Sequence, residues 1–264
     1  MITTFTTRAP GKVPAPPAGT YLVASIDVEW TKNYRIPNGN VPFCYSITYL
    51  FLPTTGTSSP AALPVEISSR YVHDIQETGD LVTLASAEIA QALHRADLIV
   101  GHQLSSDLAV LAAAGRLHGT PAHSATDLDR TRTAWHQRRQ PPPGPTAQII
   151  DTRYDAGHLL TNPSRRLVDV CTELRLDVTQ PELKGTSMTA VHRRWLDHAD
   201  TQARERVTVL NLRHGLSTAL VALISAGRLP AGQPANVNAL LARHLPDTLG
   251  WLRHPTFTGT LPPP

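Results

Sequence analysis

The stretch at residues 21–30 constrains the fold more than any other part of the chain; it reads Tyr-Leu-Val-Ala-Ser-Ile-Asp-Val-Glu-Trp. Its continuous apolar start is typical of a strand that is buried on both faces. It ends with Asp27 and Glu29, two positions apart. Because residues i and i+2 of a strand point to the same side, we expect the two carboxylates to converge. Like charges repel at that distance, so the pair is either solvated or neutralised by a cation, and hard divalent ions prefer such oxygen ligands.

A hairpin is expected directly after this strand. Residues 37–40 read Pro-Asn-Gly-Asn, and an Asn-Gly pair between two β-prone runs favours a tight hairpin turn. The returning strand is predicted at residues 43–52, and a third at residues 65–72. Lys32, Tyr34 and Arg35 lie just past the carboxylates. They are candidates for contacting a phosphate strand, and they are equally compatible with an ordinary polar hairpin.

Farther along the chain, helical patterns alternate with short buried strands. Strands are predicted at residues 97–100 and 147–150. Asp200 is expected to cap the longest helix, and Gly115 to end an earlier one. Helices are predicted at residues 81–95, 105–114, 166–176, 187–198, 201–226 and 236–244. A hairpin followed by alternating elements predicts an α/β fold, with a mixed β-sheet flanked by helices on both faces.

The chain is long enough for one substantial domain, with 264 residues of which 41% are hydrophobic. We expect residues 1–19 to form a loose leader, residues 20–228 the domain, and residues 229–264 a Pro-rich, partly helical extension with a disordered end at 256–264. The polar and basic residues 118–140, followed by the Pro-rich run at 141–145, are interpreted as an insertion or mobile surface loop.

Charge and cysteine usage narrow the class of protein. The formal net charge of +3 is compatible with a polyanionic partner but too small to indicate one by itself. Cys44 and Cys171 form neither a disulfide framework nor a zinc pattern and are interpreted as reduced core residues. The sequence shows no secretory segment and no apolar run of membrane-spanning length, so we expect a cytoplasmic protein without a membrane partner.

A second carboxylate follows a strand and a glycine turn. Residues 100–111 read Val-Gly-His-Gln-Leu-Ser-Ser-Asp-Leu-Ala-Val-Leu, which places Asp107 near the start of a helix. Together with Asp27 and Glu29, this segment resembles the first two motifs of the DEDD-type 3′-to-5′ exonucleases. Two positions depart from that pattern, since Gln103 stands for the usual Asn and Ser106 for the usual aromatic residue.

The resemblance implies a ribonuclease H-like fold and a metal-dependent exonuclease that acts on the 3′ ends of DNA or RNA. It also implies two Mg²⁺ or Mn²⁺ ions held by carboxylates from separate elements. Phosphodiester hydrolysis fits such a site, because two metal ions can activate water and stabilise both reacting oxygens. His102 is a turn histidine or a substrate contact, and Asp151 at the end of another strand is a structural carboxylate or a supporting one.

The third motif can be placed in two ways. His192 and Asp197 have the His-x-x-x-x-Asp spacing of one branch of the family, in which the histidine is the general base and the aspartate a metal ligand. Leu210 and His214 occupy the places of the Tyr and Asp of the other branch, on a strongly apolar helix. We favour His192 and Asp197 because they match in residue type as well as spacing, and keep His214 as the alternative, since neutral imidazole also binds metals.

These motifs predict an exonuclease in which Asp27, Glu29, Asp107 and Asp197 hold the metals and His192 deprotonates the attacking water. The alternative is a catalytically impaired module of the same fold that binds nucleic acid or a protein partner. The substitutions at Leu210 and His214 motivate that alternative.

Overall fold

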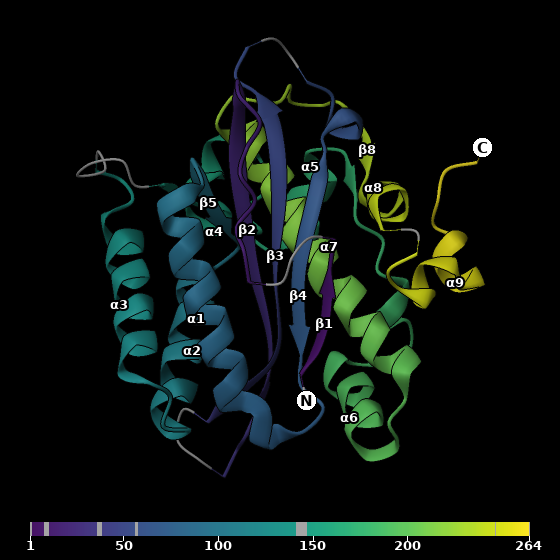
Figure 1. Cartoon of the computed structure of the whole chain (residues 1–264). Coiled ribbons are helices and arrows are strands. Elements are labelled where there is room, and N and C mark those ends of the chain that lie inside the picture. Colours follow the sequence, from purple (N-terminus) through teal and green to yellow (C-terminus); the bar gives the residue numbers. More distant parts are fainter. Residues whose placement is uncertain are drawn as a thin grey trace.

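A computed structural model describes residues 2–7, 11–35, 39–55, 58–140, 147–245 and 247–263. Its centre is a mixed sheet of six strands (Figure 1). In spatial order the strands are β1 (Thr3–Thr6), β4 (Val65–Tyr71), β3 (Asn40–Pro53), β2 (Thr20–Lys32), β5 (Leu98–Gly101) and β6 (Gln148–Asp151). The β1–β4, β4–β3 and β3–β2 pairs are antiparallel, and β2–β5 and β5–β6 are parallel. The α/β class, the mixed sheet and the single domain are therefore confirmed.

Helices cover both faces of this sheet (Figure 1). One face carries α1 (Thr78–Arg95) and α2 (Leu104–Leu117), with α3 (Ala122–Gln137) packed against both. The opposite face carries α7 (Thr201–Ser225), which crosses β2 and β3. The smaller helices are α4 (Thr152–Asp155), α5 (Leu167–Glu173) and α6 (Met188–His198). Because the strands between these layers are buried on both sides, β2 and β3 read as nearly continuous apolar runs.

Helix α7 begins at the expected cap. The side chain of Asp200 accepts a hydrogen bond from the backbone N–H of Ala203. Among the described residues, α7 is the one helix with the length and apolar character to cross a membrane. Within the fold, 94% of its most apolar window is buried, as in the core helix of a globular domain. Its all-round hydrophobicity thus reflects packing between the sheet and the C-terminal elements.

Small residues let α7 approach the sheet closely. A Cβ atom on Gly215 would lie 2.9 Å from Thr48 Oγ1 and 3.7 Å from Ser46 Oγ, both on β3. Real Cβ atoms essentially never approach other heavy atoms that closely, so a larger residue at this helix position would force Thr48 or the helix to shift. The close approach sets how far side chains of α7 must reach to meet those of β2.

The C-terminal segment packs into the domain instead of trailing from it. It contains β8 (Ala235–Asn236), paired in parallel with β7 (Leu176–Asp177), then α8 (Val237–His244), a 3₁₀ turn η5 (Gly250–Arg253) and α9 (Pro255–Thr258). Trp251 is 4% exposed and Phe257 is fully buried. The predicted disorder at residues 256–264 is wrong as far as residue 263. Phe257 belongs to the same buried hydrophobic core as Leu216 of α7 and Leu241 of α8, and so anchors this end of the chain.

Three further expectations fail at loops. Residues 118–140 are not a loop, since most of them form α3, which buries Ser124, Leu128 and Thr131. Helix α2 continues through Gly115 to Leu117. The N-terminal leader contains β1, which pairs with β4 in antiparallel fashion. The hairpin between β2 and β3 is confirmed, whereas residues 37–38 of its turn and the Pro-rich run at 141–145 lie outside the described residues.

Candidate metal centre

Asp27 and Glu29 of β2 meet His214 of α7. His214 Nδ1 lies 3.1 Å from Glu29 Oε1 and 3.6 Å from Asp27 Oδ2. One ligand atom from each of the three side chains lies within 4.8 Å of the other two. Two carboxylates and an imidazole at this separation could hold a metal ion. His214 of α7 therefore occupies the place at this site that the favoured third motif gave to His192 and Asp197 of α6.

The helical repeat of α7 brings a second polar side chain to the same place. Asn211 lies three positions before His214 and therefore shares its face of the helix. Its Nδ2 donates a hydrogen bond of 2.5 Å to Asp27 Oδ2. Leu210, one turn before His214, is a core residue with 1% exposure. Helix α7 therefore presents an amide and an imidazole to the carboxylates, and the apolar Leu210 stands where the exonuclease motif that the sequence resembles has a tyrosine.

Asp107 approaches the pair from a third element. Strand β5 runs parallel to β2, with Val100 paired to Ser25, so the chain leaves β5 beside Asp27. It then enters α2, whose first turn carries Asp107. Asp107 is 4% exposed, and its Oδ2 has no hydrogen-bond partner among the described residues. Burial raises the pKa of Asp107 well above its usual value, and the charges of Asp27 and Glu29 raise it further.

The pKa values of Glu29 and His214 are also shifted by burial and by the neighbouring charges. Burial raises the pKa of Glu29, partly offset by its hydrogen bond to His214. Burial by itself would lower the pKa of His214, but hydrogen bonds and charges from Asp27 and Glu29 raise it to about 10. The three carboxylates therefore favour a positive charge between them, which an imidazolium or a divalent ion can supply.

His192 and Asp197 do not join this group, so their placement at the metal centre is wrong. His192 Nδ1 lies 2.8 Å from the hydroxyl of Tyr71, and its ring stacks on Phe43 with centroids 3.8 Å apart. Burial lowers the pKa of His192 to about 4. Asp197 lies on the exposed side of α6. The apolar side of α6, with Val191 and Trp195, turns His192 into the core, where it has a packing role.

The residues just past the carboxylates lie on the surface of the hairpin. Lys32 and Arg35 are exposed, and Tyr34 is 85% exposed. Lys32 Nζ lies 5.2 Å from the centroid of the Tyr34 ring, a cation–π distance. The backbone N–H of Arg35 donates to Asn33 Oδ1 at 3.1 Å. Their contact with a nucleic acid stays a prediction.

His102 ties the end of β5 to its neighbours. Its Nδ1 lies 2.9 Å from Thr152 Oγ1, and its Nε2 lies 2.9 Å from the carbonyl oxygen of Arg165. Burial lowers the pKa of His102 to about 4. With both ring nitrogens engaged, this histidine holds the strand–helix junction.

Asp151 has a comparable structural role. Its Oδ1 accepts the backbone N–H groups of Gln103 and Arg153, at 2.9 and 3.2 Å. Its Oδ2 accepts from Trp135 Nε1 at 2.9 Å. The first of these bonds supports Gln103 in its left-handed conformation, with φ of 68°, immediately before α2. Asp151 therefore fixes the turn that delivers Asp107.

Two residues of the site were not predicted, Asn211 and Gln180. The spacing of three between Asn211 and His214 on one apolar helix is a signal that could have identified the former. Gln180 Nε2 lies 3.0 Å from His214 Nε2. Gln180 comes from an irregular segment 34 positions away in sequence, so no periodic pattern connects it with His214.

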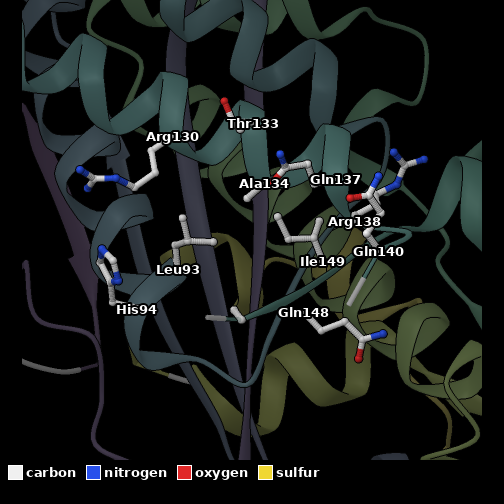
Figure 2. Close-up of a pocket in the computed structure, with 11 residues that line it drawn as sticks. Leu93, His94, Arg130, Thr133, Ala134, Gln137, Arg138, Gln140, Gln148 and Ile149 are labelled. Carbon is white, nitrogen blue, oxygen red and sulfur yellow. The ribbon is translucent and has the colours of Figure 1, made fainter. Parts of the chain in front are cut away.

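A separate cavity of about 370 Å³ lies between α1, α3 and β6 (Figure 2). Leu93, Ala134 and Ile149 form its apolar wall, and Arg130 and Arg138 lie at its margin. Arg138 is already paired with Asp155 at 2.7 Å. None of the metal-centre residues lines this cavity.

Comparison with known proteins adds no relative to this picture: neither a scan against protein-family models nor a search of curated proteins finds a match to this chain.

Proposed function

We propose that this chain is a metal-dependent nuclease with a ribonuclease H-like fold, which removes nucleotides from the 3′ ends of nucleic acids. The observation that carries the proposal is the convergence of Asp27, Glu29 and His214 within 4.8 Å, beside the buried Asp107. Within the described part of the chain, neither a lysine nor an arginine forms an ion pair with these carboxylates from two separate elements, and such buried charges are expensive unless a cation binds them. Phosphodiester hydrolysis is the reaction class that such a cluster serves best.

The proposed division of labour follows from the contacts. Asp27 and Glu29 would hold the metal from β2 and His214 from α7, with Asp107 of α2 as a further ligand. The chemistry that a divalent ion held by these residues would supply is activation of water and stabilisation of negative charge on the phosphate oxygens. Asn211 donates to Asp27 Oδ2 and so fixes the carboxylate orientation.

The ligand set bears on the choice of metal. Mg²⁺ prefers an all-oxygen environment and keeps several waters, whereas imidazole suits transition metals better. The combination of His214 with three carboxylates therefore favours Mn²⁺ over Mg²⁺. The proposal includes the second ion that the exonuclease resemblance implies, for which Asp107 would be a further carboxylate ligand.

The direct test is nucleotide release from single-stranded DNA and RNA labelled at the 3′ end, with Mn²⁺ and with Mg²⁺. We expect Mn²⁺-dependent release by the wild type and a loss of about 100-fold or more in Asp27→Asn, because removing a metal ligand forfeits several kcal/mol of transition-state stabilisation. Asp129→Asn is the matched control, since Asp129 is an exposed carboxylate of α3. Equal release by the wild type and Asp27→Asn contradicts the proposal.

A second candidate is a non-catalytic module that binds nucleic acid. One observation favours it. His214 contacts both carboxylates of β2 and Asn211 donates to Asp27, so a protonated His214 can balance their charge without a metal. Calorimetry separates the two. Absence of Mn²⁺ binding together with retained oligonucleotide binding supports the module, and Mn²⁺ binding that is lost in Asp27→Asn supports the nuclease.

A further inference from the structure

A group of arginines lies beside the edge of the sheet at which β5 and β6 end. Arg153 follows β6 in α4, and its Nη1 donates to the carbonyl oxygen of Arg165 at 3.3 Å. The same oxygen lies 2.9 Å from His102 Nε2. One carbonyl oxygen thus joins the Arg153 guanidinium to the histidine that follows β5. Arg166, the next residue along the chain, is exposed.

This edge also carries the carboxylates of the proposed metal centre. The registers of β2 with β5 and of β5 with β6 place Asp27, His102 and Thr152 in one row, each two positions after residues that pair across the strands. Neighbouring strands lie about 4.8 Å apart, so β6 ends about 10 Å from Asp27. One strand of a nucleic acid covers such a distance in a few nucleotides. The pKa of His102, which burial lowers, is lowered further by the charge of Arg153 and raised by that of Asp27, so both side chains lie near its ring.

The guanidinium groups are held in position without being neutralised. Arg165 Nη1 donates to the carbonyl oxygens of Asn162 and Ser164 at 2.6 and 3.1 Å. Among the residues that the structure describes, Arg153, Arg165 and Arg166 form no ion pair. A carbonyl oxygen orients a guanidinium but does not cancel its charge, and the remaining N–H groups can donate to the oxygens of a phosphate.

The acids nearby do not offset this positive charge. Arg138 and Arg139 share the single carboxylate of Asp155, at 2.7 and 3.3 Å, so two positive charges face one negative charge. The nearby Glu173 accepts hydrogen bonds from the backbone of residues 161 and 162. The surface between the metal centre and α3 therefore carries an excess of positive charge, which attracts a polyanion.

Tyr154 adds an aromatic ring to this surface. It follows Arg153 on α4 and is 45% exposed. Its ring packs edge-on against Trp135, with centroids 6.0 Å apart and planes at 76°, and the guanidinium carbon of Arg138 lies 5.9 Å from its centroid. An exposed ring beside guanidinium groups is the combination that binds unpaired bases, because a base stacks on the ring while the cations follow the phosphates. In a duplex, stacking between neighbouring pairs covers the faces of the bases.

We propose that the substrate is a single nucleic-acid strand, which runs from the metal centre toward β6 and α4, with its phosphates on Arg153, Arg165 and Arg166 and a base stacked on Tyr154. The inference rests on the proposed nuclease function and specifies its substrate as single-stranded. Charge and stacking recognise the backbone and the faces of the bases, which single-stranded DNA and RNA share.

The salt dependence of binding tests the arginines. Binding of a fluorescein-labelled oligothymidylate is followed by anisotropy, with chelator present so that the strand is not cut. Each lost phosphate contact lowers the slope of log K against log salt by about 0.7, so Arg153→Gln/Arg165→Gln should lower it by about 1.4 and the exposed Arg166→Gln by about 0.7. Thermal unfolding shows whether each variant is folded.

Two further variants decide where the strand runs. Arg132→Gln removes a charge from the exposed side of α3 and is the matched control, which should leave the slope unchanged. Lys32→Gln/Arg35→Gln removes two charges from the hairpin after β2. A slope that falls in this hairpin variant and stays unchanged in the arginine variants of the β6 side shows that the strand runs over the hairpin, and overturns the proposed path.

Tyr154 tests the single-stranded assignment. Tyr154→Leu should weaken binding of the oligothymidylate by about 5- to 150-fold, the usual effect of losing one stacked base, and Tyr154→Phe should bind like the wild type. The same strand annealed to oligoadenylate should bind the wild type more weakly, and Tyr154→Leu should not change the affinity for this duplex. Equal affinities for strand and duplex, or equal effects of the Leu and Phe substitutions, overturn the assignment.

Kinetics with Mn²⁺ separate this inference from the proposed function. Loss of contacts made equally to bound strand and transition state should raise KM for nucleotide release and leave kcat near the wild-type value. A wild type that neither binds the oligothymidylate nor releases nucleotides from it overturns the nuclease and this inference together. A wild type that releases nucleotides equally from strand and duplex, with KM unchanged in the arginine and tyrosine variants, overturns only the strand path and the single-stranded assignment.

Discussion

His214 determines the chemical character of the proposed metal centre. It contacts both carboxylates of β2, and it stands at the position where the exonuclease motif that the sequence resembles has an aspartate. Compared with an aspartate, a histidine at this position offers a nitrogen atom that also binds a proton. A proton and a metal ion therefore compete for the same atom, Nδ1.

Restoring the carboxylate should shift this balance toward Mg²⁺. In His214→Asp we expect the affinity for Mg²⁺ to rise by about tenfold or more, because the site gains a hard oxygen ligand and loses a competing proton. Mg²⁺-dependent release from labelled strands should rise with it. His123→Asp on α3 is the control, since it adds the same charge at an exposed position. Unchanged Mg²⁺ affinity in His214→Asp contradicts the assignment of this residue.

The pH dependence of stability is a second consequence of His214. Its pKa is raised from an ordinary 6.5 to about 10 in the folded protein by Asp27 and Glu29, against the lowering effect of burial. A raised histidine pKa stabilises the fold fully below pH 6.5, and the stabilisation is lost as the pH rises through about 10. With chelator present, the free energy of unfolding in urea should therefore fall across that window. His214→Leu should show a smaller fall, and identical pH profiles for the two proteins refute this account.

The carboxylates of the site were more predictable than its remaining members. Asp27 and Glu29 share a strand end, and Asp107 follows a glycine turn, so local spacing contains the information. The contributions of His214, Asn211 and Gln180 depend on which helix lies over β2. That choice is tertiary: His192 and Asp197 match the motif letter by letter, but α6 packs His192 against Tyr71 and Phe43.

At the scale of elements, the contact between α7 and the sheet sets the geometry of the site. Gly215 follows His214 directly, and its lack of a side chain allows the helix to rest on Thr48 of β3. Any change in this spacing moves His214 relative to Asp27 and Glu29. The site therefore depends on a packing contact that includes none of its own ligands.

Gly215→Ala tests this dependence. Its Cβ would meet Thr48 Oγ1 at 2.9 Å, so we expect a loss of about 1–3 kcal/mol in the free energy of unfolding and a weaker affinity for Mn²⁺. Adding Thr48→Ala removes the clashing atom and should recover part of both losses. If the two substitutions act additively in a denaturant-unfolding cycle, the close contact is not the cause.

Most element types follow from hydrophobic pattern, because buried strands and amphipathic helices have distinct periods. One exception is α3, whose sequence Ala-His-Ser-Ala-Thr-Asp-Leu-Asp-Arg-Thr-Arg-Thr-Ala-Trp-His-Gln is mostly polar. It buries only a narrow stripe against α1 and α2, and the ion pairs Arg130–Asp127 and Arg132–Asp129 cover its exposed side. A helix on the outside of other helices needs few apolar residues, so its pattern resembles that of a loop.

At the scale of the whole molecule, the C-terminal segment is part of the domain. Trp251 and Asn238 each form a hydrogen bond to the buried Arg213–Glu182 ion pair, whose Arg213 is next to His214 in the sequence, and Phe257 is buried in the core. The proline and glycine content of this segment predicts an extension. Composition does not reveal that a single aromatic residue, Phe257, anchors the chain end in the core. The C-terminal segment therefore packs into the hydrophobic core of the domain, although its composition indicates an extension.

Phe257→Ala should therefore destabilise the entire domain. Phe257 is fully buried, and emptying such a site costs about 3–5 kcal/mol. Thr256→Ala, at the exposed neighbouring position, is the control and should change stability little. Thermal unfolding checks both. A melting temperature of Phe257→Ala equal to that of the control shows that residues 254–263 do not contribute to the core.

The central claim is that Asp27, Glu29 and His214 bind a divalent metal ion. The most direct measurement is X-ray diffraction from crystals soaked in Mn²⁺, with data collected for anomalous scattering. The account predicts an anomalous peak between Asp27, Glu29 and His214 Nδ1, at about 2.0–2.3 Å from each coordinating atom. A fully soaked crystal that shows no peak there, with His214 still hydrogen-bonded to Glu29, contradicts it.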